Sequence, residues 1–96
     1  MVEVRKTAAF AEWYGGLRDG RAQARIDIRI RRLELGLLGD VKPVGTGISE
    51  FRIDYGPGYR VYFVLRGKTL IVLLGGGDKR SQTADIKAAK ALAARL

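Results

Sequence analysis

Hydrophobic and polar residues follow strand-like patterns near the N-terminus and through much of the C-terminal half. Residues 2–7, 48–55 and 59–66 alternate between apolar and polar side chains, as strands with one covered face do. Residues 69–74 are apolar at nearly every position, which predicts a strand inside the sheet, covered on both faces. Glycine-containing turn signals separate the last three segments. The pattern thus predicts a first strand and a later three-strand meander.

Apolar residues recur at helical spacing in residues 8–17, 20–36 and 82–95. Side chains that can cap a helix N-terminus precede or begin these segments: Thr7, Asp19, and either Ser81 or Thr83. The second helix carries an apolar stripe of Ala22, Ile26, Ile30, Leu33 and Leu37. The aromatic residues of the first helix are predicted to belong to the core rather than to a platform for stacked bases. Residues 38–47, rich in glycine, are predicted to form a loop.

Length and composition limit the classes of protein to which this chain can belong. A chain of 96 residues with 47% hydrophobic residues can form one core, so a single domain over residues 1–96 is expected. No stretch approaches the ~20 apolar residues that cross a bilayer, and the N-terminus reads as a strand rather than a secretory signal. The absence of cysteine excludes disulfides and thiolate zinc sites. A cytoplasmic protein without membrane, metal or small-molecule cofactor is expected.

Basic residues dominate the charge. The 18 Lys and Arg against 10 Asp and Glu give a net charge of +8, which favours a polyanionic or acidic partner. With no histidine, any acid–base chemistry must use other side chains. The second helix carries an arginine ladder beside its apolar stripe, formed by Arg21, Arg25, Arg29 and Arg32. This ladder is either a solvated face or a contact surface for RNA or a partner, and Lys42 in the following loop extends it.

Candidate chemistry is concentrated in residues 48–83. Alternation places Arg52, Arg60 and Tyr62 on one face of the predicted meander. The glycine-rich basic segment GGGDKR, residues 75–80, follows the last strand. Its glycines either form an anion-binding nest or only let the chain turn tightly into the helix. Arginines beside such a nest are suited to binding phosphodiesters.

The chain resembles the RelE/ParE superfamily of type II toxins, and specifically the HigB-like addiction-module killer branch. The matching stretches are EFRID at residues 50–54, GYRVYF at residues 58–63 and GGDKRSQTADIKAAK at residues 76–90. The resemblance spans the whole chain and implies an α+β, RelE-like fold. In that fold an N-terminal strand precedes a helical hairpin, a three-strand antiparallel meander and a C-terminal helix. The first strand is expected to pair in parallel with the last, and the hairpin to pack on one side of the sheet.

The resemblance also implies a function. Many such toxins are metal-independent, ribosome-dependent mRNA endonucleases that inhibit translation, so mRNA and the ribosome are expected partners. A helix-turn-helix antitoxin from the same operon is expected to neutralise the toxin. The alternatives are a ParE-like inhibitor of DNA gyrase without catalysis, and an inactive basic relative that binds nucleic acid.

Carried over residue by residue, the RelE-type basic site corresponds to Arg52, Arg60 and Lys79 or Arg80. The expected catalytic set therefore comprises Arg52, Arg60, Lys79, Arg80, Asp54 and Tyr62, and the expected RNA- and ribosome-binding set comprises Arg21, Arg25, Arg29, Arg32 and Lys42. The chain departs from RelE because Asp54 stands where a second lysine is expected and no tyrosine follows the GGGDKR segment.

These departures leave the acid–base roles open. Asp54 is either a base or a residue that holds Arg52 or Arg60 in position, and Glu50 has the same two interpretations. Tyr62 is a candidate proton donor or stacking residue. Arg60, for its part, either binds phosphate or only pairs with Asp54 across the hairpin.

Overall fold

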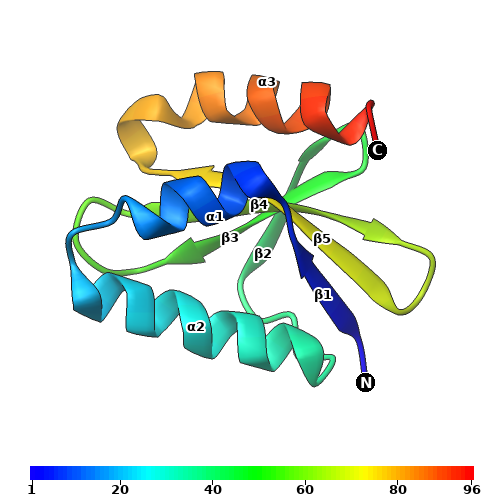
Figure 1. Cartoon of the computed structure of the whole chain (residues 1–96), viewed down its shortest axis with the longest axis horizontal. Coiled ribbons are helices and arrows are strands. Elements are labelled where there is room, and N and C mark those ends of the chain that lie inside the picture. The colour runs from blue at the N-terminus through cyan, green and yellow to red at the C-terminus, as the bar shows by residue number, and fades with distance from the viewer.

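A computed structural model describes residues 1–96 and has a central sheet with helices on both faces (Figure 1). The elements follow in the order β1 (Glu3–Lys6), α1 (Ala8–Gly15), α2 (Gly20–Glu34), β2 (Val41–Gly45), β3 (Ile48–Ile53), β4 (Tyr59–Arg66), β5 (Leu70–Gly77), a 3₁₀ turn η1 (Lys79–Ser81) and α3 (Gln82–Ala93). No helix is both long and apolar enough to cross a membrane.

The sheet has five strands in the order β1-β5-β4-β3-β2. Strands β2 to β5 form an antiparallel meander, and β1 returns to pair in parallel with β5. This confirms the predicted α+β fold, the parallel pairing of the first and last strands, and the internal position of the most apolar strand. Strand β5 needs apolar residues on both faces because it lies between β1 and β4 and is covered from both sides.

Helices α1 and α2 cover one face of the sheet, as predicted for the hairpin (Figure 1). The Thr7 hydroxyl accepts a hydrogen bond from the Phe10 amide at 3.2 Å, and the Asp19 carboxylate accepts one from the Arg21 amide at 2.9 Å. Both predicted caps are therefore present. The core between these helices and the sheet comprises Phe10, Ile26, Ile30, Leu33, Phe51, Ile53, Val61, Phe63, Ile71 and Leu73.

Helix α3 covers the opposite face (Figure 1). A smaller apolar cluster lies between it and the strands, formed by Ile48, Tyr62, Val64, Val72, Leu74, Ala89 and Ala93. The same face also holds two buried charged residues, Glu50 and Arg60. Alternation along β3 and β4 therefore separates an all-apolar face from a mixed one.

The structure corrects three local predictions. Residues 41–45, expected in a loop, form edge strand β2. The sequence did not predict this strand because Pro43 and a bulge after it interrupt the alternating pattern. The glycines of the GGGDKR segment belong to β5 rather than to a loop. Leu37 is 58% exposed because α2 ends at Glu34, so the apolar stripe of that helix is shorter than expected.

Candidate functional site

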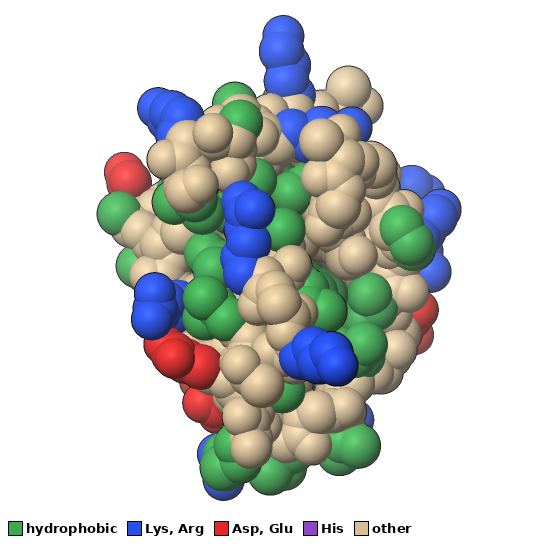
Figure 2. Space-filling view, turned by 90° about the vertical axis from the view of Figure 1, so that its right-hand side faces the viewer, with side chains coloured by type: hydrophobic (Ala, Val, Ile, Leu, Met, Phe, Trp, Pro, Cys, Tyr) green, Lys and Arg blue, Asp and Glu red, His purple; other side chains and the backbone are tan.

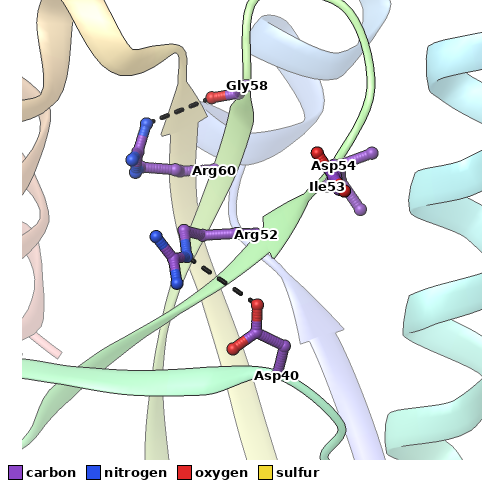
Figure 3. A pocket seen from close by; sticks show the side chains of 6 residues that line it. All are labelled: Asp40, Arg52, Ile53, Asp54, Gly58 and Arg60. Carbon is purple, nitrogen blue, oxygen red and sulfur yellow. Dashed lines mark hydrogen bonds and ion pairs between the residues drawn. The ribbon is translucent and has the colours of Figure 1, made fainter.

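Two arginines stand side by side at the end of the sheet where β3 leaves it and β4 enters it. Arg52 on β3 is the direct cross-strand partner of Arg60 on β4, so both side chains project from the α3 face. Both guanidinium groups lie on the same side of the two strands (Figure 3). The alternation-based prediction that these arginines share one face is confirmed.

Arg60 is held by a buried polar cluster beneath the start of α3. Its Nε lies 3.5 Å from Oε2 of Glu50, and its Nη1 donates a hydrogen bond to the Gly58 carbonyl at 3.2 Å. The side chain of Glu50 is 1% exposed and accepts a second contact, from Nε2 of Gln82 at 3.3 Å. Nε of Arg60 makes no hydrogen bond, so the ion pair with Glu50 and the hydrogen bond to Gly58 together hold the Arg60 guanidinium in place.

Tyr62 lies two residues further along β4 on the same face, and its ring is fully buried. Its hydroxyl has no hydrogen-bond partner in the protein. Burial, together with the nearby carboxylates of Glu50 and Asp85, raises the pKa of Tyr62 to about 12. A buried ring offers no surface on which a base can stack, so the stacking role expected for Tyr62 is wrong.

A cavity of about 350 Å³ opens in front of the two arginines. Its wall includes Arg52, Arg60, Asp54 and Gly58, and Asp40 closes it on the side of β2 (Figure 3). Nε of Arg52 lies 3.8 Å from Oδ2 of Asp40, and both side chains are largely exposed. An exposed pair of this kind contributes little to stability, so Arg52 can exchange Asp40 for another anion at low cost.

A second cavity, of about 390 Å³, adjoins the first on the side of α2. Both cavities are lined by Asp40, Arg52, Ile53 and Asp54, and the second adds Arg25, Arg29 and Arg32 from the arginine ladder. We call the two together the arginine groove. The sequence presented the ladder and the strand arginines as separate features, but the fold joins them in one basic depression.

The members of the ladder have different roles. Nη1 of Arg29 donates to the Arg52 carbonyl at 2.6 Å and its Nη2 donates to the Asp40 carbonyl at 3.1 Å. Its guanidinium also stacks 4.9 Å from the centre of the Phe51 ring, and burial lowers its pKa. Arg29 therefore anchors the floor of the groove. Arg25 and Arg32 are exposed along its wall and neither pairs with a carboxylate, although the Arg25 guanidinium lies 4.7 Å from the centre of the Tyr55 ring.

Arg21 and Lys42 do not line the arginine groove. Lys42 is exposed on β2, opposite Glu50 in the register of β2 and β3. Their expected contacts with RNA or the ribosome remain predictions.

The glycine run does not form an open anion nest. A Cβ atom at Gly76 would overlap the Trp13 ring on one face, and one at Gly77 would overlap the Asp85 carboxylate on the other. Gly76 and Gly77 are therefore required because helices approach the strand closely on both faces, whereas a Cβ atom at Gly75 would meet nothing. Lys79 and Arg80 follow in η1, exposed and outside the groove, and Nη2 of Arg80 lies 3.2 Å from Oδ2 of Asp78.

Asp54 does not hold either arginine. Arg52 pairs with Asp40 and Arg60 with Glu50, so the expected cross-hairpin pair between Arg60 and Asp54 is wrong. Figure 3 shows the Asp54 side chain on the far side of β3 from both guanidinium groups. Its carboxylate is exposed and lines both parts of the groove. For Glu50, in contrast, the structure supports the positioning interpretation.

Sequence reasoning missed Asp40 and Gln82. Asp40 precedes the unrecognised strand β2, and only the pairing of β2 with β3 brings it to Arg52. Gln82 begins α3 and reaches Glu50 over 32 residues of sequence separation. No local pattern identifies such contacts, although an acidic residue at a predicted buried strand position, as at Glu50, was a usable signal for a cationic partner.

The groove can bind and orient a phosphodiester. Arginine donors match phosphate oxygens, and Arg60 is oriented in advance by buried contacts. No group of three or more His, Cys, Asp or Glu side chains is placed to hold a metal ion.

No family model matches the chain. An uncharacterized protein of Haemophilus influenzae is 47% identical over 95 residues, which cover 99% of this chain and 96% of that protein. This chain therefore belongs to the same family as the Haemophilus influenzae protein. Among solved structures, the toxin–antitoxin complex RelBE2 from Mycobacterium tuberculosis contains a chain that matches with a TM-score of 0.65 and 22% identity. That match covers 81% of this chain and 98% of the other, and it shows that the fold is RelE-like.

Proposed function

We propose that this member of the Haemophilus influenzae protein's family is the toxin of a type II toxin–antitoxin module, of the HigB-like branch, and that it cleaves mRNA on translating ribosomes in the cytoplasm. The observation that carries the proposal is the arginine groove, where Arg52 and Arg60 lie beside the exposed ladder arginines Arg25 and Arg32. The RelE-like fold is consistent with it. Its neutralising partner is proposed to be a helix-turn-helix antitoxin from the same operon.

The proposed substrate lies along the groove as a single strand. The scissile phosphate sits between Arg52 and Arg60, and the phosphate of a neighbouring nucleotide lies against Arg25 and Arg32. Successive phosphates of a strand can follow such a track because each arginine offers a planar fork of N–H donors. Sequence-independent phosphate contacts would also make binding strongly dependent on salt.

The proposed reaction uses the RNA as its own nucleophile. The ribose 2′-oxygen attacks the adjacent phosphorus, the bond from phosphorus to the 5′-oxygen breaks, and a cyclic phosphate and a free 5′-hydroxyl form. Arg52 and Arg60 stabilise the negative charge that grows on the phosphate oxygens. Because Asp54 lies on the far side of β3 from both guanidinium groups, solvent is the proposed acceptor of the 2′-hydroxyl proton, and solvent also supplies a proton to the leaving oxygen.

The test is mapping of mRNA 5′ ends shortly after the chain is induced alone. Wild-type protein and an Arg31→Ala control, which alters an exposed arginine outside the groove, are expected to create new ends within translated codons. Arg60→Ala is expected to create none. Arrested growth with unchanged mRNA ends and broken DNA would instead indicate a gyrase inhibitor, and unchanged growth an inactive relative.

A further inference from the structure

One carboxylate in the arginine groove has no partner. Asp54 lines both parts of the groove with its side chain exposed, and it makes no side-chain hydrogen bond or ion pair, whereas Asp40 is paired with Arg52. An unpaired carboxylate repels the phosphates of an RNA strand and weakens its binding. The parts of RNA that can offset this cost are the base edges, because they carry N–H donors.

The cations of the chain are concentrated around this carboxylate. Four arginines line the same cavity as Asp54: Arg25, Arg29, Arg32 and Arg52. Figure 2 looks onto the side where β1 and the end of α3 lie, and there the basic side chains lie mostly apart from one another, with apolar surface between them. A bound RNA strand therefore meets Asp54 inside a cavity that is otherwise dominated by arginines.

The guanidinium of Arg25 is held in place in the same cavity. It lies 4.7 Å from the centre of the Tyr55 ring, and the Tyr55 hydroxyl donates a hydrogen bond to Oδ2 of Asp19 at 2.9 Å. One face of the guanidinium is covered by the ring, and because Arg25 is exposed, its other face is left for a second planar group. Proteins that bind single-stranded RNA stack bases on arginine planes in this way.

Apolar side chains complete the wall of this cavity. Ile28 of α2 is 54% exposed there, and Ile53 lies beside it in the lining. Phosphates gain nothing from an apolar wall, whereas the flat face of a base loses little on leaving water. The cavity of about 390 Å³ thus combines a cationic plane, an apolar wall and an unused hydrogen-bond acceptor.

The acceptor selects one base. An ionised carboxylate offers two acceptor oxygens side by side and no donor. The Watson–Crick edge of guanine offers two neighbouring donors, N1–H and the N2 amino group. Adenine and cytosine offer one amino group beside a ring nitrogen that accepts, and uracil offers one N–H between two carbonyl oxygens. On this edge, only guanine can donate to both carboxylate oxygens through neighbouring N–H groups.

We propose that the second cavity of the arginine groove is a guanine-selective subsite for single-stranded RNA. The guanine stacks on the free face of Arg25, lies against Ile28 and donates from N1 and N2 to the carboxylate of Asp54. Arg25 can bind a phosphate at the same time, since phosphate oxygens meet the edge of a guanidinium and bases stack on its face. The proposal rests on the proposed function and makes Asp54 a residue that determines specificity.

The experiment measures the affinity of the full chain for short RNAs that differ in one base. Each probe is a fluorescein-labelled heptamer of 2′-O-methyl nucleotides with guanosine, inosine or adenosine at the centre of a uridine strand, or with uridine throughout. The 2′-O-methyl group removes the nucleophile, so fluorescence anisotropy reports binding without cleavage. Inosine lacks only the N2 amino group of guanosine and therefore tests one of the two hydrogen bonds.

Wild type is expected to bind the guanosine heptamer about tenfold more tightly than the uridine heptamer, with inosine between them. Asp54→Ala should bind all four heptamers with similar affinity. Glu12→Ala is the matched control, because Glu12 is exposed on α1, lies outside the groove and changes the net charge equally when removed. This control should keep the guanosine preference.

A second variant tests the stack. Arg25→Lys keeps the positive charge but loses the plane, so it should weaken binding of the guanosine heptamer about tenfold and of the uridine heptamer only about threefold. In wild type, the guanosine heptamer should shift the NMR methyl signals of Ile28 more than the uridine heptamer does. Equal shifts would place the guanine elsewhere and overturn the proposal.

Equal affinity of wild type for the four heptamers would overturn the guanine subsite and leave the proposed RNA groove intact. A guanosine preference that persists in Asp54→Ala would also overturn it. So would a variant that binds every heptamer more tightly by the same factor, since the carboxylate then only repels phosphate. Absence of binding to all heptamers would overturn the subsite and, together with unchanged mRNA ends in the mapping assay, the proposed function as well.

Discussion

The two faces of the sheet are built by different rules. The face under α1 and α2 packs ten buried residues that are all apolar, including the ring pair Phe51 and Phe63 with centroids 6.2 Å apart. The face under α3 has seven buried residues in its apolar cluster and adds the buried charges Glu50 and Arg60 and the unpaired Tyr62 hydroxyl. Neighbours in sequence such as Glu50 and Phe51 thus belong to opposite environments.

This difference separates stability from chemistry on one sheet. Apolar residues on the first face gain free energy simply by leaving water. Polar groups on the second face lose their hydrogen bonds with water, and only specific partners in the protein can replace these bonds. Their presence there therefore indicates a role other than stability. Substitutions on the apolar face should therefore mainly lower the free energy of unfolding, whereas substitutions on the mixed face should mainly weaken RNA binding and activity.

The largest loss of stability is expected on the apolar face. Phe51→Ala removes a fully buried ring, and the cavity left behind should lower the free energy of unfolding by about 3–5 kcal/mol. Urea denaturation followed by circular dichroism measures this change. Leu65→Ala, on the half-exposed end of β4, is a control expected to cost less than about 1.5 kcal/mol. An equal loss in both variants would contradict the assignment of the core.

The buried pair on the mixed face should respond in a way that no apolar contact does. Glu50→Ala leaves Arg60 without its carboxylate and is expected to cost about 3 kcal/mol, because an uncompensated buried charge remains. The double variant Glu50→Leu, Arg60→Met should recover to within about 1 kcal/mol of wild type by urea denaturation. It should nevertheless have no activity in the mRNA assay. A double variant less stable than Glu50→Ala would show that the pair itself stabilises the fold.

Arg52 should affect binding without affecting the fold. Its pair with Asp40 is exposed, so Arg52→Ala should change the free energy of unfolding by less than about 1 kcal/mol. Fluorescence anisotropy with a short single-stranded RNA should show affinity reduced about tenfold, since a charge-assisted contact is lost. Asp40→Asn is expected to raise affinity in the same assay. Unchanged affinity in both variants would remove the groove from RNA binding.

The smallest effect is expected at Tyr62. Tyr62→Phe removes an unpaired buried hydroxyl and should leave stability at neutral pH unchanged or raise it by up to about 1 kcal/mol. Because the folded-state pKa of about 12 exceeds the ordinary value of 10.0, the folded chain holds this proton more tightly than the unfolded chain. The stability that comes from this tighter proton binding is fully present below pH 10 and is lost as the pH rises toward 12. Wild type should therefore lose more stability than Tyr62→Phe over that range, measured by urea denaturation.

Much of the fold follows from local sequence, and the misses have a common cause. The caps at Thr7 and Asp19 and the bounds of β4 were predictable because capping and alternation involve near neighbours. Strand β2 was not, because Pro43 weakens its local signal and only pairing with β3 defines it. Gly76 and Gly77 suggested a loop because only the packing of α1 and α3 against β5 shows that Trp13 and Asp85 leave no room for a Cβ atom there.

The candidate site divides in the same way. Alternation alone predicts that Arg52 and Arg60 share one face, whereas Asp40 is evident as the partner of Arg52 only from the fold. For Glu50 the sequence left two interpretations, and the fold supports the one in which it positions Arg60. The stacking role for Tyr62 failed because the pattern shows which face a residue occupies and not whether a helix covers it. The roles of Lys79, Arg80 and Asp54 in cleavage remain predictions.

The sequence alone determined the order of the helices and of every strand except β2, the excess of positive charge and the shared face of the two strand arginines. Each of these depends on residues that are neighbours in the chain or on simple counts. Tertiary structure decided that Arg60 is buried with Glu50 and that Arg29 of the ladder binds backbone carbonyls. It also decided that arginines from α2 and β3 line one groove. These properties depend on distances between segments far apart in the chain, and burial determines the free energy of each charge.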